Sequence, residues 1–159
     1  MAFSQNIARL RSLLQNFEVG EVKLLKDMSH QKAVLSVGSA KTLDPSESGR
    51  LVWLESSAGL FTLTLPSVAA GLQYRMMVTE HTPTGAITIA AGSAIIFGKI
   101  NETEVDDTED GPGSSGNTGA SNLIIGTTAH RGDWVEFYSD GTSWYIHGSS
   151  AADGAFTTS

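Results

Sequence analysis

The stretch GDWVEFYSDGTSWYIHG, residues 132–148, decides the fold class of this chain. In it, two runs of alternating large apolar and polar side chains flank the dipeptide Asp140-Gly141. Alternation with a period of two indicates a strand with one buried face. Asp-Gly between two such runs favours the type I′ turn of a two-residue β-hairpin. The stretch therefore predicts an antiparallel hairpin.

The same turn predicts the register of the hairpin. Phe137 would pair with Trp144, and Val135 with Ile146, so that all four side chains share the face that we expect to be buried. A slip of one residue would scatter this apolar set over both faces. Pattern and turn thus indicate one register, with these four residues as the hairpin core.

The opposite face of the hairpin carries three aromatic residues, Trp134, Tyr138 and Tyr145. Two interpretations are open for them. They either pack laterally under a loop or contact another subunit, because Trp and Tyr are favoured anchors of interfaces.

Short runs of the same kind recur along the chain from about residue 19, separated by Gly, Pro, Asn and Asp. Many short strands at such intervals are typical of a β-sandwich or barrel. The chain is therefore predicted to be mainly β, a β-sandwich or barrel-like domain with one short N-terminal helix. The expected strands are 21–25, 33–37, 50–55, 60–65, 73–80, 86–90, 94–98, 122–127, 133–139 and 142–148.

The only helical pattern lies at the N-terminus, where apolar residues are spaced by three and four. Such spacing forms a narrow apolar stripe on one side of a helix. The stripe either packs on the sheet of its own domain or forms a seam with other copies or a partner; we expect it to serve assembly. Its residues are Phe3, Ile7, Leu10, Leu14 and Phe17.

The predicted organisation is a helical arm over residues 1–20, a β domain over 21–149 and a flexible C-terminal tail over 150–159. Within the β domain, residues 101–121 hold six carboxylates, four glycines and neither Lys nor Arg. Such a composition buries too little apolar area to offset the entropy lost on ordering. We expect an exposed acidic loop there, with a weak calcium site as the alternative.

The residues that carry chemistry are few. The chain has no cysteine, and its four histidines lack the helical spacing of a metal site. The sequence also contains no nucleophile-elbow pattern. Gly111, Gly113 and Gly116 match the dinucleotide-binding pattern, but an acidic run precedes them where a strand is required. Arg131-Gly132-Asp133 is interpreted as a turn into the last hairpin. We expect no enzyme, no metal and no cofactor.

The formal net charge is -7. An acidic surface repels phosphate backbones and anionic lipid, so neither nucleic acid nor membrane is an expected partner. No apolar run approaches the roughly 20 residues that span a bilayer. Arg9 and Arg11 interrupt any secretory signal, so we expect synthesis in a cytoplasm.

The closing stretch resembles a recurring ending of tailed-bacteriophage virion proteins. A Gly-Asp turn leads there into a strand, a Ser-Asp-Gly turn and a Trp-Tyr strand that ends in Gly. TLTLPSVAAGLQYRMMV (62–78) and AITIAAGSAIIFG (86–98) continue the likeness, which covers roughly residues 58–148. The first 40 residues show no such likeness.

Such domains occur in capsid decoration (cement) proteins and in tail, neck or fibre parts. The resemblance, together with the short chain and its lack of internal repeats, implies a cement protein. It would bind the phage major capsid protein as a homotrimer on the outer surface of the capsid, after synthesis in the host cytoplasm. The alternatives are a tail, neck or fibre component and a glycan-binding module.

Overall fold

The computed structural model describes residues 34–55, 59–80, 83–93, 95–102 and 119–159. All of them belong to one compact unit, Ala33–Ser159. The predicted N-terminal helix, its apolar stripe and the strand expected at 21–25 lie outside the described residues. So does most of the acidic segment.

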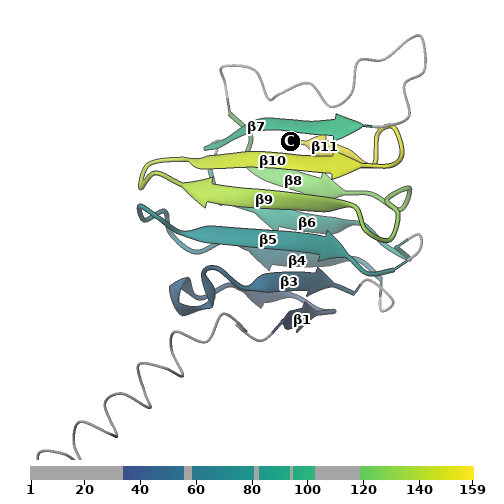
Figure 1. Ribbon diagram of the computed structural model, residues 1–159, viewed down its shortest axis with the longest axis horizontal. Coiled ribbons are helices and arrows are strands. Elements are labelled where there is room, and N and C mark those ends of the chain that lie inside the picture. The colour runs from purple at the N-terminus through teal and green to yellow at the C-terminus, as the bar shows by residue number, and fades with distance from the viewer. Residues whose placement is uncertain (1–33, 56–58, 81–82, 94, 103–118) are drawn as a thin grey trace, which may run out of the picture. The chain divides into compact units, whose positions relative to one another are not determined.

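Two mixed β-sheets stack face to face in the described part of the chain, which confirms the mainly β prediction (Figure 1). The six-stranded sheet has, in spatial order, β1 (Leu35–Val37), β3 (Leu51–Leu54), β5 (Gln73–Val78), β9 (Trp134–Ser139), β10 (Trp144–Ser150) and β7 (Ile96–Glu102). The five-stranded sheet has β11 (Phe156–Thr158), β8 (Asn122–Ile125), β6 (Ile87–Ala90), β4 (Phe61–Thr64) and β2 (Lys41–Thr42).

The first half of the described chain winds between the two sheets. β1, β3 and β5 lie parallel in the six-stranded sheet, and β2, β4 and β6 lie parallel in the five-stranded sheet. Each pair of consecutive strands therefore adds one strand to each sheet. A short 3₁₀ helix (Pro45–Glu47), capped by the carboxylate of Asp44, makes one of the crossings.

The second half of the chain closes both sheets with mostly antiparallel pairs. β9 lies antiparallel between β5 and β10, whereas β7 lies parallel to β10 at the edge of the sheet. β8 pairs with β6, and β11 pairs with β8, both antiparallel. Residues far apart in sequence thereby become neighbours across the six-stranded sheet.

The core lies between the sheets and follows the alternation of the sequence. In β4, Phe61 and Leu63 are buried while Thr62 between them is exposed. Trp144 is fully buried against Tyr74 and Phe137, with ring centroids 6.0 and 6.3 Å away. The four residues of the predicted hairpin core, Val135, Phe137, Trp144 and Ile146, all lie in this core.

The register predicted for the hairpin is wrong by two residues. Trp144 pairs with Ser139, and Ile146 with Phe137, so the connection is the four-residue loop 140–143 instead of a two-residue turn. Asp140 explains the longer loop: its Oδ1 atom accepts hydrogen bonds of 2.8 Å from the backbone N–H groups of Thr142 and Ser143. A shift of two residues keeps every side chain on its face.

The prediction of a flexible tail over residues 150–159 is also wrong. β10 extends to Ser150, and Phe156–Thr158 form β11, the edge strand beside β8. Ala155 and Phe156 are fully buried. The segment is anchored because Phe156 adds a large aromatic side chain to the core. The sequence did not predict this, because the neighbours of Phe156 are small and polar.

Candidate functional site

The outer face of the six-stranded sheet is the candidate functional site. The pairing of the strands places its side chains in three rows that run across the sheet. We call them the tryptophan row (Trp53, Met77, Trp134), the charged row (Leu51, Arg75, Glu136, His147, Lys99) and the tyrosine row (Gln73, Tyr138, Tyr145, Phe97).

An ion pair at the centre of the charged row ties the three rows together. Arg75 Nη1 lies 3.5 Å from Glu136 Oε1. The guanidinium carbon of Arg75 also lies 4.8 Å from the ring centroid of Trp134, a cation–π distance. On the other side, Glu136 accepts a hydrogen bond from the hydroxyl of Tyr138. One cation and one carboxylate thus hold an aromatic side chain in each outer row.

The tyrosine row presents rings whose hydroxyl groups are already bonded. Tyr145 donates to Asp140 Oδ2 at 3.1 Å, and its ring centroid lies 6.2 Å from that of Phe97. The hydrogen bond to Glu136 raises the pKa of Tyr138, and the one to Asp140 raises the pKa of Tyr145. Both phenols therefore stay neutral at physiological pH. The ring of Tyr138 is tied to its own strand and that of Tyr145 to loop 140–143.

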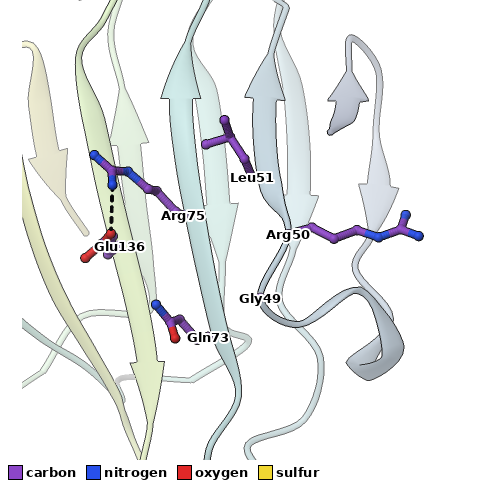
Figure 2. Close-up of a pocket in the computed structure, with 6 residues that line it drawn as sticks. All are labelled: Gly49, Arg50, Leu51, Gln73, Arg75 and Glu136. Carbon is purple, nitrogen blue, oxygen red and sulfur yellow. Dashed lines mark ion pairs between the residues drawn. The ribbon is translucent and has the colours of Figure 1, made fainter. Parts of the chain in front are cut away.

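A shallow pocket of about 220 Å³ opens on this face between the charged row and the tyrosine row. Figure 2 shows Arg75 and Gln73 side by side on β5, with Glu136 across from Arg75 on β9, and Arg50 directed away from them. Gln73 both lines the pocket and begins the tyrosine row. The pocket therefore offers an amide, a guanidinium and a carboxylate beside a row of aromatic rings. It is lined by Gly49, Arg50, Leu51, Gln73, Arg75 and Glu136.

The outer face of the five-stranded sheet differs in composition. The strand register places small and polar side chains there, with Thr62 beside Thr88 and Thr64 beside Ala90. Apart from Ile124, this face carries no large apolar side chain among the residues of β4, β6 and β8. The contrast between the two outer faces makes the six-stranded sheet the candidate surface for binding.

Of the aromatic residues predicted for an interface, the structure brings Trp134, Tyr138 and Tyr145 to this one face. Tyr138 is 40% and Tyr145 46% exposed. Trp134 is half-buried between Arg75 and His147, whose ring centroid lies 5.5 Å away. Among the described residues, no loop covers the two tyrosines.

The sequence alone did not indicate Trp53, which is 39% exposed on the same face. It lies in the continuous apolar run Leu51–Leu54, where alternation gives no signal of inside and outside. Its place beside Met77 follows only from the parallel pairing of β3 with β5.

Asp133 of the Arg-Gly-Asp tripeptide is buried and serves the fold. Its carboxylate accepts hydrogen bonds from the backbone N–H of His130, the backbone N–H of Ala151 and the hydroxyl of Ser150. It thereby fastens the turn before β9 to the end of β10, in agreement with the interpretation as a structural turn.

Comparison with protein-family models finds no match. Comparison with curated proteins finds none either.

Within the described ranges, no group of three or more His, Asp or Glu side chains is placed to hold a metal ion. The calcium alternative for residues 101–121 falls mostly outside those ranges and stays a prediction. No helix among the described residues is long and apolar enough to cross a membrane.

Proposed function

We propose that this chain is a non-enzymatic structural subunit of a tailed-bacteriophage virion, a capsid decoration protein that acts as a homotrimer. The resemblance of residues 58–148 to virion proteins supports the phage context. One structural observation carries the assembly role: Trp53 stands exposed, beside the half-buried Met77 and Trp134, on the outer face of a sheet whose core is complete without them.

The tryptophan row has the composition of an interface anchor. Trp, Met and Arg are enriched at the centres of protein interfaces, and Trp, Tyr and Arg dominate their binding energy. Here Trp53, Met77 and Trp134 lie in one row with Arg75 stacked on the last ring. Arg75 is already paired with Glu136, so covering it would not leave a lone charge buried.

Assembly through this row would work by burial of area. Apolar surface contributes roughly 25 cal/mol per Å² when it is removed from water, before the costs of association. A threefold assembly needs a heterologous interface, in which two different patches of the same chain meet. The tryptophan row would therefore face another patch of a neighbouring copy. In this proposal the major capsid protein meets a separate surface, to which the N-terminal stripe contributes.

Light scattering of the purified protein tests the oligomeric state. We expect a mass three times the 16.8 kDa of one chain, and we expect Trp53→Ala to shift the protein toward the monomer. Thr62→Ala on the opposite sheet is the matched control and leaves the trimer intact. A monomer or dimer of the unchanged protein at micromolar concentration would contradict the proposal.

Imaging of assembled particles tests the location. Density for the protein at threefold-related positions of the outer shell supports decoration. Density on the tail, neck or fibres would assign the chain to those parts instead.

A further inference from the structure

The tyrosine row forms a continuous strip across four strands and ends in the polar pocket. Gln73 on β5, Tyr138 on β9, Tyr145 on β10 and Phe97 on β7 are direct cross-strand neighbours. The ring centroids of Tyr145 and Phe97 lie 6.2 Å apart, so these two rings are neighbours along the strip. The strip thus combines stacking surfaces in one line with hydrogen-bonding groups at one end.

The size of the strip indicates a narrow occupant. Tyr138 and Tyr145 are 40% and 46% exposed, which corresponds to roughly 100 Å² each for side chains of this size. A stable protein interface needs about 800 Å² on each partner. The strip alone supplies far less, so it fits a chain about one ring wide better than a folded protein.

The charges around the strip indicate a neutral occupant. The guanidinium of Arg75 is paired with Glu136 in the pocket, and Arg50 is directed away from both (Figure 2). Lys99 lies in the charged row beside the strip, and the carboxylate of Asp140 bonds to the hydroxyl of Tyr145 at the other side of the strip. Single-stranded nucleic acid also stacks on aromatic rings, but it requires a positively charged groove. This strip does not form one.

The rings are held in place before any ligand binds. The hydroxyl of Tyr138 donates to Glu136, and that of Tyr145 donates to Asp140. Groups already ordered in the free protein lose little entropy on binding, and this improves affinity without new contacts. Gln73, Arg75 and Glu136 add both donors and acceptors, the set that hydroxyl groups require.

We propose that the tyrosine row and the adjoining pocket bind a neutral oligosaccharide. Its sugar rings stack on Tyr138, Tyr145 and Phe97, and the hydroxyl groups of its terminal ring bond to Gln73 and to the Arg75–Glu136 pair. An extended β-1,4-linked chain fits because it is about one sugar ring wide, like the strip. The stacking rings of this site lie in a different row from the assembly contact, and the two share only Arg75. The inference does not rest on the proposed function.

Titration of the full-length protein with cellohexaose and chitohexaose, followed by the backbone amide signals in NMR, tests the proposal. We expect at least one of them to bind with a Kd of about 1 mM or tighter. The shifted amide signals should be those of Gln73, Tyr138 and Tyr145. Tyr145→Ala should weaken binding by about tenfold, the effect of losing one stacked ring. Thr62→Ala should leave the affinity for the oligosaccharide unchanged. Trp53→Ala should impair assembly but leave that affinity unchanged.

A hexasaccharide of galacturonate provides the charge control, and we expect it to bind more weakly than the neutral probes. The proposal is wrong if neither neutral probe shifts any amide signal at about 10 mM. Equal affinity of the folded Tyr145→Ala variant would overturn it as well. So would tighter binding of galacturonate, which would indicate a site for anions.

Discussion

The hydroxyl of Tyr145 donates a hydrogen bond of 3.1 Å to Oδ2 of Asp140, while Oδ1 of the same carboxylate accepts the two backbone hydrogen bonds that shape loop 140–143. One side chain therefore sets the hairpin register and also orients a ring on the outer face. The turn that the sequence marks as a fold signal is part of the candidate site.

Replacing Asp140 should destabilise the hairpin. The pKa of Asp140 lies below its ordinary value of 3.8 because its carboxylate accepts hydrogen bonds from the backbone N–H groups of Thr142, which has the larger effect, and Ser143. The stabilisation is therefore present above that pH and is lost as the pH falls through the lowered pKa of the folded state. In urea denaturation near pH 7, Asp140→Ala should be less stable than Asp140→Asn, which keeps an acceptor oxygen. Equal stability of both variants and the unchanged protein would show that the loop does not need this carboxylate.

Adjacent residues of β10 should differ in their effect on stability because they point to opposite faces. Trp144→Ala removes a fully buried ring and should cost about 3–5 kcal/mol. Tyr145→Ala removes an exposed ring with one hydrogen bond and should cost about 1 kcal/mol or less. Chemical denaturation measures both. Similar losses would mean that the outer face is covered within the isolated chain.

The C-terminal strand should be required for full stability. Phe156→Ala should cost about 3–5 kcal/mol because Phe156 is fully buried between the sheets. Thr157→Ala, at the exposed neighbouring position of β11, is the control and should have little effect. Calorimetry of the two variants distinguishes an anchored strand from a flexible tail. If the segment were a flexible tail, neither substitution would change the melting temperature.

Glu102 should make stability depend on pH in the opposite sense to Asp140. The pKa of Glu102 is raised from 4.5 to about 7, mainly because the carboxyl is buried and also because the carboxyl of Asp153 lies beside it. The folded state therefore binds this proton more tightly than the unfolded state, and stability falls as the pH rises from 4.5 to about 7. Melting temperatures measured between those pH limits should fall less steeply for Glu102→Gln than for the unchanged protein. Above pH 7, the melting temperature of Glu102→Gln should be the higher of the two. Glu55→Gln is the control. A Glu102→Gln profile parallel to that of the unchanged protein would exclude this assignment.

The N-terminal segment should serve attachment and not folding. A chain that begins at residue 33 contains the whole compact unit Ala33–Ser159 and should keep its β circular dichroism and a cooperative melt. If the apolar stripe from Phe3 to Phe17 contacts the shell, this shortened chain should bind undecorated capsids far more weakly. Equally tight binding would remove the stripe from the attachment surface, and loss of the fold would indicate that it packs on its own domain.

The sequence by itself determined which face of each strand is buried where apolar and polar residues alternate. The core residues Phe137 and Trp144 and the outward Tyr138 and Tyr145 follow from that alternation, even though the predicted register was wrong by two residues. The reason is local: successive side chains of a strand point to opposite sides, and a shift of two residues leaves the sides unchanged.

Only the tertiary structure decided which strands are neighbours, and with them the candidate site. The parallel winding of β1 to β6 places Trp53 beside Met77, and the parallel pairing of β7 with β10 places Phe97 beside Tyr145. Parallel strands are joined by crossings and not by turns, so no local signal marks their order. Phe156 likewise becomes a core residue only because β8 offers it an edge. The rows of the outer face arise from contacts between distant segments, whose free energy depends on the whole fold.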